Sequence, residues 1–281
     1  MIISIASGKG GTGKTTVAVS LASSLGQNRE LSFFDCDVEE PNASFFLKPN
    51  ITTSIPVLSP VPEINESKCT FCGQCAEICE YNALAVLKDQ VMVFPELCHG
   101  CGGCQLLCPE GAIQEKGRRI GVIEHGDTNS IRFTQGILDV GQVLSPPLIR
   151  EVKTTLKPES LNIIDAPPGT SCPTIESVKG SDYCVLVTEP TPFGLNDLEI
   201  SVNVLKQLKI PYGVVLNRAG IGNDDVIHFC EKENIDILME IPMDKNIAKA
   251  YSRGEVISET FPEFQDRFIR MFERIHNTST S

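Results

Sequence analysis

Two groups of residues in this sequence have the types and spacing that chemistry requires. Near the N-terminus, four glycines are interspersed with lysines and threonines in the stretch Gly8-Lys-Gly-Gly-Thr-Gly-Lys-Thr-Thr16. Further along the chain, eight of the twelve cysteines fall between Cys69 and Cys108. A glycine-rich loop ending in lysine and threonine is typical of phosphate binding, and closely spaced cysteines are typical of metal or iron–sulfur ligation.

The glycine-rich stretch has the phosphate-loop spacing, with four residues between Gly8 and Gly13. Glycines let the backbone wrap phosphates, and the loop N–H groups and the positive end of the next helix then point at them. We expect Lys14 to contact the β and γ oxygens and Thr15 to offer its hydroxyl to Mg²⁺. A glycine-rich turn without a ligand is the alternative. The expected nucleotide-binding residues here are Gly8, Lys9, Gly10, Gly11, Thr12, Gly13, Lys14, Thr15 and Thr16.

The cysteines form two runs of the pattern C-x2-C-x2-C-x3-C, offset by 29 residues as Cys69 and Cys98 show. This pattern resembles that of bacterial ferredoxins with two [4Fe–4S] clusters, in which the fourth cysteine of each run ligates the other cluster. Zinc is the alternative that soft thiolates also bind. The predicted ligand sets are Cys69, Cys72, Cys75 and Cys108 for one cluster, and Cys98, Cys101, Cys104 and Cys79 for the second.

Short apolar segments must position these groups. Buried strands are expected at residues 1–6, 30–35, 161–165, 183–188 and 212–217, with a helix over 17–25 after the glycine-rich loop. Asp35 and Asp37 follow the second strand, and Asp165 ends the third. Ligands collect at the carboxyl ends of parallel strands, so we expect these carboxylates beside the phosphate loop. Ordinary turn and cap roles are the alternative for Asp35 and Asp37.

Whole-chain properties restrict the class of protein. The chain has 281 residues and a formal charge of −12, which argues against a broad nucleic-acid surface or an anionic membrane surface. No apolar stretch approaches the length of a membrane span, and the N-terminus lacks a basic leader. Dense cysteines in a chain of this kind indicate metal ligands rather than disulfides. We therefore expect a cytoplasmic protein.

The two lysines of the phosphate loop, Lys9 and Lys14, resemble the deviant phosphate loop of the MinD/ParA/nitrogenase-iron-protein class. The resemblance implies an ATP-dependent homodimer in which Lys9 reaches the partner's ATP. It also implies that Asp37 orients or activates the attacking water, and that Asp35 supports Mg²⁺ or Lys14. Asp165 would bind Mg²⁺ through water, and Gly169 would offer its N–H to the γ-phosphate. The residues implied at the adenine are Asn217, Arg218, Pro242 and Met243, and Glu39, Pro41 and Asn42 would touch nucleotide or partner.

The expected fold is α/β, a doubly wound and mainly parallel sheet with a small inserted ferredoxin-like domain. Residues 1–61 and 118–281 resemble the MinD-type ATPase, and residues 62–117 resemble the ferredoxin. The stretch 51–62 is rich in threonine, serine and proline and predicts a linker. Near the C-terminus, apolar residues on one helical face predict core packing rather than a membrane-binding helix. They are Phe264, Phe268, Phe272 and Ile275.

Cys172 lies seven residues after Asp165, where the nitrogenase iron protein carries one ligand of an intersubunit cluster. No cysteine lies between Cys108 and Cys172 to act as the second ligand, so we expect a buried or interface thiol. Three functions fit the sequence. The leading hypothesis is an ATPase that couples a nucleotide-switched dimer to electron transfer with a redox partner. The alternatives are a carrier that gives a cluster to an apo-protein acceptor, and a regulatory ATPase with redox-sensing clusters.

Overall fold

The computed structural model describes residues 1–279, which divide into two compact units. Unit 1 comprises residues 1–54, 123–137 and the chain from Ile149 onward. Unit 2 comprises residues 55–122 and 138–148. The chain passes between the units along two long strands, β3 (Asn50–Ile64) and β6 (Ile113–Thr128), each of which has residues in both units.

A nine-stranded sheet has the order β11-β10-β9-β1-β8-β2-β7-β6-β3. The pairs from β11 to β7 are parallel. Ile5 and Asp35 both pair with Asp165, so the carboxyl ends of three central strands lie side by side. The remaining strands of this sheet are β1 (Ile2–Ala6), β2 (Leu31–Asp35), β7 (Ile131–Leu138), β8 (Leu161–Asp165), β9 (Tyr183–Thr188), β10 (Tyr212–Ala219) and β11 (Ile237–Pro242).

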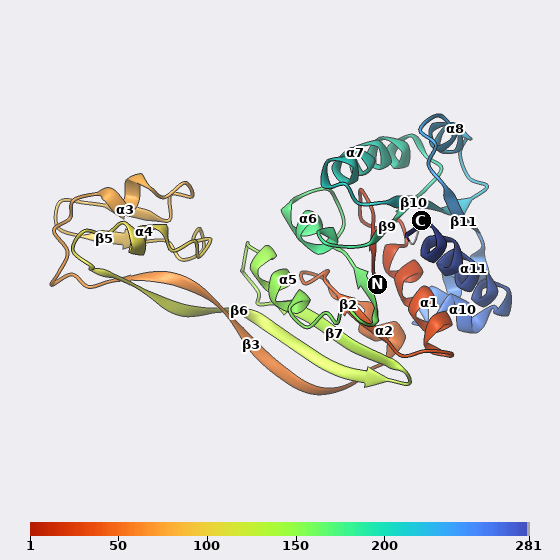
Figure 1. The fold of residues 1–281 in the computed structure, drawn as a ribbon, viewed down its shortest axis with the longest axis horizontal. Coiled ribbons are helices and arrows are strands. Elements are labelled where there is room, and N and C mark those ends of the chain that lie inside the picture. The colour runs from red at the N-terminus through yellow and green to blue at the C-terminus, as the bar shows by residue number, and fades with distance from the viewer. Residues whose placement is uncertain (280–281) are drawn as a thin grey trace. The chain divides into compact units, whose positions relative to one another are not determined.

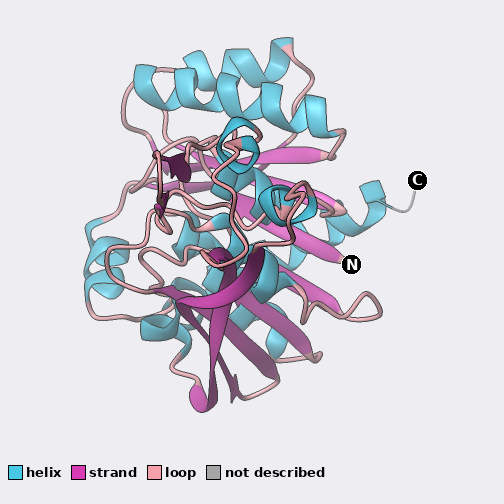
Figure 2. Ribbon diagram, turned by 90° about the vertical axis from the view of Figure 1, so that its left-hand side faces the viewer, coloured by secondary structure: helices cyan, strands magenta, loops and turns pink. Residues whose placement is uncertain are grey.

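Helices cover both faces of the parallel strands, as Figures 1 and 2 show. One core cluster joins the strands to α1 (Lys14–Gly26), α2 (Ala43–Leu47), α10 (Ile257–Thr260) and α11 (Pro262–Ser279). The other joins them to α6 (Cys172–Val178), α7 (Pro192–Leu208) and α8 (Asp225–Lys232). Helices α5 (Pro146–Lys153) and α9 (Lys245–Ser252) complete the set around this sheet. The predicted doubly wound architecture is confirmed.

The predicted core packing of the C-terminal helix is also confirmed. Phe264, Phe268, Phe272 and Ile275 are buried in the cluster that contains α1 and the central strands. In the described part of the chain, no helix combines the length and apolar character that crossing a membrane requires.

The prediction of a linker over residues 51–62 is wrong, because this segment lies within the edge strand β3. Proline misled the prediction, since it removes a backbone donor and is excluded from central strands. Here Pro56, Pro60 and Pro62 are separated by even numbers of residues, so their missing N–H groups share one side of the strand. The odd-numbered Asn65, just past β3, donates its N–H to the Ala112 carbonyl oxygen. An edge strand can accommodate such prolines, and here Pro62 is buried at the second cysteine cavity while Pro56 is exposed.

The cysteine runs of unit 2 have nearly the same backbone in both copies. Helices α3 (Gln74–Glu77) and α4 (Gly103–Leu106) are offset by the repeat, and β4 (Leu84–Val86) pairs antiparallel with β5 (Val91–Val93). Left-handed residues recur at matching positions, with φ of 55° at Phe71 and 65° at Gly100, and 51° at Asn82 and 56° at Gly111. Between residues 65 and 119, the buried apolar side chains are Ala83, Leu84, Ala112 and Ile113.

Candidate functional site

The glycine-rich loop connects the end of β1 at Ala6 to the start of α1 at Lys14. Gly11 and Gly13 have φ of 78° and 92°, a conformation that L side chains rarely adopt. A Cβ at Gly13 would also lie 2.2 Å from Nδ2 of Asn217. The Asn217 amide donates to the Thr12 carbonyl oxygen at 2.7 Å, so a strand end 200 residues away fixes this loop.

Lys14 is buried beneath the loop and lies between two carboxylates. Its Nζ is 2.8 Å from Oδ1 of Asp165 and 3.6 Å from Oδ2 of Asp37. Burial opposes the charge of Lys14, but the nearby Asp165 and Asp37 carboxylates outweigh it and raise the pKa of the ammonium group. The structure thus brings the predicted phosphate-binding lysine to the predicted strand-end acids.

Three buried oxygens at this site lack a hydrogen-bond partner in the structure. They are Oδ2 of Asp165, Oγ1 of Thr12 and Oδ1 of Asn42. Buried polar atoms almost always find partners, so such atoms indicate a place for a ligand. Asp165 and the neighbouring Thr15 hydroxyl supply the oxygen ligands that Mg²⁺ prefers, and the loop N–H groups suit phosphate. The residues present therefore fit a magnesium–nucleotide complex.

Asp35 fixes the segment after β2, and the support of Mg²⁺ or Lys14 that the resemblance implied stays a prediction. Its carboxylate accepts hydrogen bonds from the backbone N–H groups of Asp37, Asn42 and Ala43 at 3.0–3.1 Å. Burial and the neighbouring Asp165 carboxylate raise the pKa of Asp35. Because all three donors belong to the segment that follows β2, Asp35 anchors that segment, and its charge also helps to raise the pKa of Lys14.

Asp37 lies in the cleft, with Oδ2 directed at Lys14. Burial raises its pKa to about 6, although Lys14 acts in the opposite direction. A carboxylate with a pKa this close to neutrality is suited to exchanging a proton with water. Gly169, the other predicted switch residue, donates its N–H to the Ser7 carbonyl oxygen at 2.9 Å. That bond must open before this N–H can reach a phosphate.

The nucleotide-sized cleft beside the loop has a volume of about 420 Å³. Pro242 and Met243 line it, as do Asn217 and Arg218. Arg218 has a left-handed backbone, with φ of 56°, and donates to the Gly11 carbonyl oxygen at 3.2 Å. Sequence reasoning missed Tyr251 of α9, which also lines this cleft and packs its ring on Phe46 at 5.1 Å between centroids.

Glu189 is a second residue that sequence reasoning missed. It follows β9, and its buried carboxylate lies 2.6 Å from the Arg218 guanidinium and 3.7 Å from the Lys9 ammonium. The predicted partner-reaching lysine is therefore paired within its own chain in this structure. The sequence feature that could have identified Glu189 is its position directly after a buried strand.

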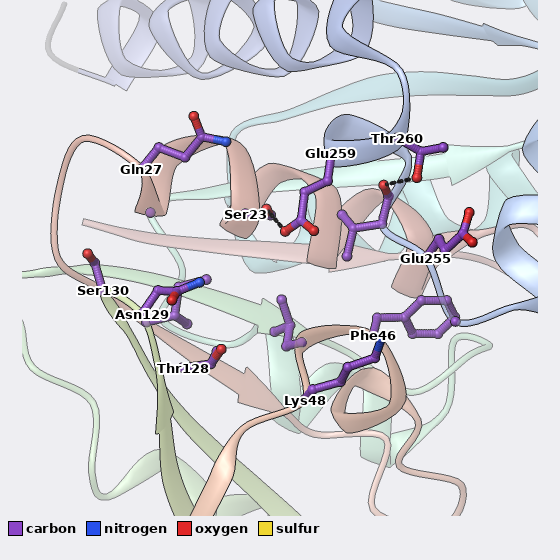
Figure 3. A pocket seen from close by; sticks show the side chains of 15 residues that line it. Ser23, Gln27, Phe46, Lys48, Thr128, Asn129, Ser130, Glu255, Glu259 and Thr260 are labelled. Carbon is purple, nitrogen blue, oxygen red and sulfur yellow. Dashed lines mark hydrogen bonds between the residues drawn. The ribbon is translucent and has the colours of Figure 1, made fainter.

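A larger cavity, of about 770 Å³, lies elsewhere in unit 1 (Figure 3). Ser23, Gln27 and Lys48 line it, and the Ser23 hydroxyl donates to Glu259 at 2.5 Å. Ser23 lies near the C-terminal end of α1 and Lys14 at its start, so the cavity is roughly 15 Å from the phosphate loop. Of the buried oxygens that lack partners in the described residues, none lines it. We assign no chemistry to it.

The eight predicted cluster ligands of unit 2 divide between two cavities. Cys69, Cys72, Cys75 and Cys108 line one. Cys79, Cys98, Cys101 and Cys104 line the other. Each cavity thus combines three cysteines of one run with the last cysteine of the other run.

Backbone N–H groups are directed at the sulfurs in the same way in both runs. Phe71 N donates to Cys69 Sγ and Gly100 N to Cys98 Sγ, both at 3.4 Å. Ala83 and Ala112 donate to Cys79 and Cys108, both at 3.3 Å. Such bonds stabilise negative charge on thiolates and tune iron–sulfur centres. The donor set therefore fits four-thiolate clusters in both cavities.

Zinc is the alternative that four thiolates also bind. A zinc site needs four ligands converging on one point, whereas each thiolate of a [4Fe–4S] cluster binds a different iron.

Cys172 begins α6 and is exposed, so the prediction of a buried thiol is wrong and only the interface alternative is left. The chain carries this cysteine outside both cysteine-lined cavities. Tyr81 and His99 stack beside the second cavity, with ring centroids 3.5 Å apart.

Comparison with known proteins places this fold among relatives. The family model of the CobQ/CobB/MinD/ParA nucleotide binding domain matches residues 3–257. Uncharacterized protein MJ0579 of Methanocaldococcus jannaschii is 31% identical over 258 residues, 91% of this chain and 90% of its own length. An iron-sulfur cluster carrier protein of Pyrococcus horikoshii is 24% identical, covering 98% of this chain and 85% of its own. MinD of Pyrococcus horikoshii, solved with Mg-ADP, superposes with a TM-score of 0.63 at 22% identity, over 98% of this chain and 95% of its own.

Proposed function

Because this chain belongs to the CobQ/CobB/MinD/ParA nucleotide-binding family, we propose that it is a Mg²⁺-dependent ATPase whose nucleotide state controls electron transfer through two [4Fe–4S] clusters. The observation that carries this proposal is the presence, in one chain, of two cavities with four cysteines each and a buried Lys14 between Asp165 and Asp37. A nucleotide switch and an electron store are thus covalently joined.

In the nucleotide unit, Lys14 and the loop N–H groups bind the β and γ phosphates, while Thr15 and Asp165 hold Mg²⁺. Asp37 orients the attacking water and takes its proton as the water oxygen bonds to the γ-phosphorus and the bond to the leaving oxygen of ADP breaks. When bound, Mg²⁺ neutralises charge on the phosphates. Asn217, Arg218, Pro242 and Met243 surround the base. Turnover is slow without a partner.

ATP binding assembles a homodimer in this proposal. Lys9 leaves its own chain and contacts the ATP of the partner subunit, which supplies positive charge where negative charge gathers in the transition state. The segment after β2, anchored by Asp35, and the turn at Gly169 are the parts that respond to the γ-phosphate. Hydrolysis of ATP then lets the two subunits separate.

In unit 2, the two four-cysteine sets hold the clusters, which supply one-electron redox chemistry when bound. The N–H groups of Phe71, Gly100, Ala83 and Ala112 stabilise the thiolates. All twelve cysteines are free in the structure, which suits a reducing, cytoplasmic compartment. The partner is a redox protein rather than nucleic acid, given the charge of −12.

A second candidate function is cluster transfer to an apo-protein, and one observation favours it. The similar protein of Pyrococcus horikoshii is named an iron-sulfur cluster carrier. Permanent clusters favour electron transfer, because eight ligands in two closed sets leave no position open for an acceptor thiol. The two functions differ in whether the clusters leave the protein.

The test is an anaerobic redox titration with EPR detection on the reconstituted protein, with and without ATP·Mg²⁺. We expect two [4Fe–4S] signals, and a nucleotide-dependent change in their potentials or in the rate of electron delivery to a small-protein acceptor. Lys14→Ala is the matched control, because it keeps all eight cysteines and should respond to no nucleotide. If the potentials and the rate of electron delivery in the wild type do not change with ATP, the nucleotide site and the clusters are not coupled. Rapid loss of the clusters to an apo-ferredoxin favours the carrier function.

A further inference from the structure

Glu189 binds two cations that the proposed function assigns to nucleotide. Its side chain is 8% exposed, with Oε1 2.6 Å from Arg218 and Oε2 3.7 Å from Nζ of Lys9. Lys9 is 33% exposed and Arg218 is 44% exposed. The carboxylate is thus the buried member of the group, and both cations approach it from the more exposed side of the site.

The backbone around Glu189 is fixed by close approaches. A Cβ at Gly194 would lie 2.2 Å from the Glu189 carbonyl oxygen, and one at Gly222 would lie 1.9 Å from the Pro190 carbonyl oxygen. The Thr191 N–H donates to the Glu189 carbonyl oxygen at 2.8 Å. The Lys9 backbone is held too, since its carbonyl oxygen accepts a hydrogen bond from Ser7 Oγ at 2.8 Å. The Lys9 side chain, however, is long and more exposed than the buried Glu189 carboxylate, so the lysine side chain is the member of this group that can move.

We propose that Glu189 is a positioning residue that holds Lys9 within its own chain and thereby sets the ATP concentration at which the dimer forms. This inference rests on the proposed function, in which Lys9 acts on the partner's ATP. One ammonium group cannot remain on Glu189 and also contact a phosphate across an interface. Dimer formation must therefore break two Lys9–Glu189 ion pairs, one in each subunit.

Arg218 explains how the buried carboxylate tolerates the loss of Lys9. An unpaired buried charge is strongly destabilising, so a carboxylate with one partner would resist releasing it. Arg218 stays within 2.6 Å of Glu189 and is itself held by the Gly11 carbonyl oxygen. With this second cation in place, only the weaker and longer Lys9 contact has to open. The pair acts as a latch of modest strength.

The strength of a partly exposed ion pair sets the expected effect. An ion pair of this kind favours the paired over the unpaired arrangement by about 2- to 5-fold. Because dimer formation breaks two such pairs, they raise the dimer dissociation constant by roughly 4- to 25-fold. Removing the carboxylate should therefore strengthen the ATP-dependent dimer by a factor in this range. Monomer affinity for ADP should change less than 2-fold, because in the proposed function Lys9 contacts the partner's ATP, and Arg218 keeps its hydrogen bond to the Gly11 carbonyl oxygen.

The experiment compares wild type, Glu189→Gln and Glu233→Gln by sedimentation over a range of ATP concentrations, with ADP binding measured in parallel. Glu233→Gln is the matched control, since it breaks an exposed 2.7 Å ion pair between Lys206 of α7 and Glu233, the residue after α8. We expect Glu189→Gln to dimerise at a lower ATP concentration than the wild type, and Glu233→Gln to dimerise at the same concentration as the wild type. In the nucleotide-free monomer, Lys9 of this variant should also react faster with an amine-acetylating reagent, read by mass spectrometry.

Two results overturn the inference. An unchanged dimerisation midpoint in Glu189→Gln, even with faster labelling of Lys9, means that the ion pair does not control assembly. An equal change in ADP affinity means that Glu189 acts through the phosphate loop or Arg218. Lys9→Ala separates this failure from failure of the proposed function. If that variant dimerises and hydrolyses ATP as the wild type does, Lys9 does not act on the partner's ATP. The proposed control of dimer formation by Glu189 is then wrong as well.

Discussion

In unit 1 the predicted phosphate-binding lysine, Lys14, is buried between carboxylates on a sheet with large apolar clusters on both faces. In unit 2 the eight cysteines are half-buried or exposed, and four small or medium apolar side chains form the buried centre of residues 65–119. One site is built on a core that exists without its ligand. The other has too little apolar surface to hold its backbone by burial alone.

This difference indicates how each unit depends on its ligand. Metal-centred modules with small cores derive much of their folding free energy from the metal–thiolate bonds. A sheet with a conventional core gains only the binding free energy of the ligand when nucleotide is present. We therefore expect cluster loss to unfold unit 2 locally and nucleotide loss to leave unit 1 folded. Four experiments test the contrast, and their expected effects decrease in order.

Removal of the clusters should have the largest effect. We expect treatment with an iron chelator and oxidant to lower amide-exchange protection in residues 65–112 by more than about 100-fold, equivalent to about 3 kcal/mol. Protection in β1 and β8 should change less than about 3-fold. Hydrogen exchange read by mass spectrometry measures both regions in one sample. Equal loss in both regions would contradict independent stabilisation.

Lys14→Ala should abolish nucleotide binding while leaving the clusters intact. We expect the affinity for Mg-ADP to fall by about 100-fold or more, and unit 1 to lose about 3 kcal/mol, because Asp165 keeps a buried charge without its partner. Calorimetric titration and thermal unfolding measure these changes. Lys206→Ala, which removes an exposed ion pair with Glu233, is the control and should leave the thermal unfolding temperature nearly unchanged. Nucleotide binding by Lys14→Ala would be incompatible with the assigned site.

Asp37→Asn should stabilise the nucleotide-free protein and stop hydrolysis. Burial raises the pKa of Asp37 from 3.8 to about 6, so the native state binds a proton that the unfolded state releases between these values. The stabilisation of the wild-type native state by this proton is present in full below pH 4 and is lost as the pH rises through 6. The variant should therefore gain up to about 3 kcal/mol over wild type between pH 4 and pH 7. Urea unfolding followed by tyrosine fluorescence reports mainly on unit 1, which holds Tyr183, Tyr212 and Tyr251. A gain that is independent of pH would disprove this origin.

The smallest effect concerns the two cysteine runs. Gly111 and Asn82 occupy equivalent left-handed positions, and a Cβ at Gly111 would meet no atom within 4 Å. Gly111→Ala should therefore cost only the conformational penalty, about 1 kcal/mol, and Asn82→Gly should change stability by less than about 0.5 kcal/mol. The temperature at which the clusters' visible absorbance is lost measures both. A larger loss in Asn82→Gly would show that the Asn82 side chain matters.

The sequence predicted those features that depend on local pattern. The strands 161–165 and 183–188 are apolar runs with clear ends, and they match β8 and β9 residue for residue. Proline gave the wrong prediction for β3, because a single sequence does not show which side of a strand faces its neighbour. The role of Asp35 was missed because its three donors lie in an irregular loop.

The contacts of Glu189 could not be predicted for a different reason. Lys9 and Glu189 are 180 residues apart, and only the order of β9 beside β1 brings them together. Tyr251 likewise reaches the cleft from a helix far along the chain. Such pairings follow from sheet order, which short motifs do not specify.

The prolines of β3 have a consequence for assembly. An unpaired strand edge is a template on which further chains can add by hydrogen bonding, and this is how many proteins form fibres. Pro56 removes one donor from the exposed part of this 15-residue strand. Further along the strand, Pro62 is buried at the second cysteine cavity and the Pro60 carbonyl oxygen lies 3.8 Å from Cys98 Sγ. The strand edge is thus protected in two ways, by a missing donor at Pro56 and by the cysteine-rich loop beyond it.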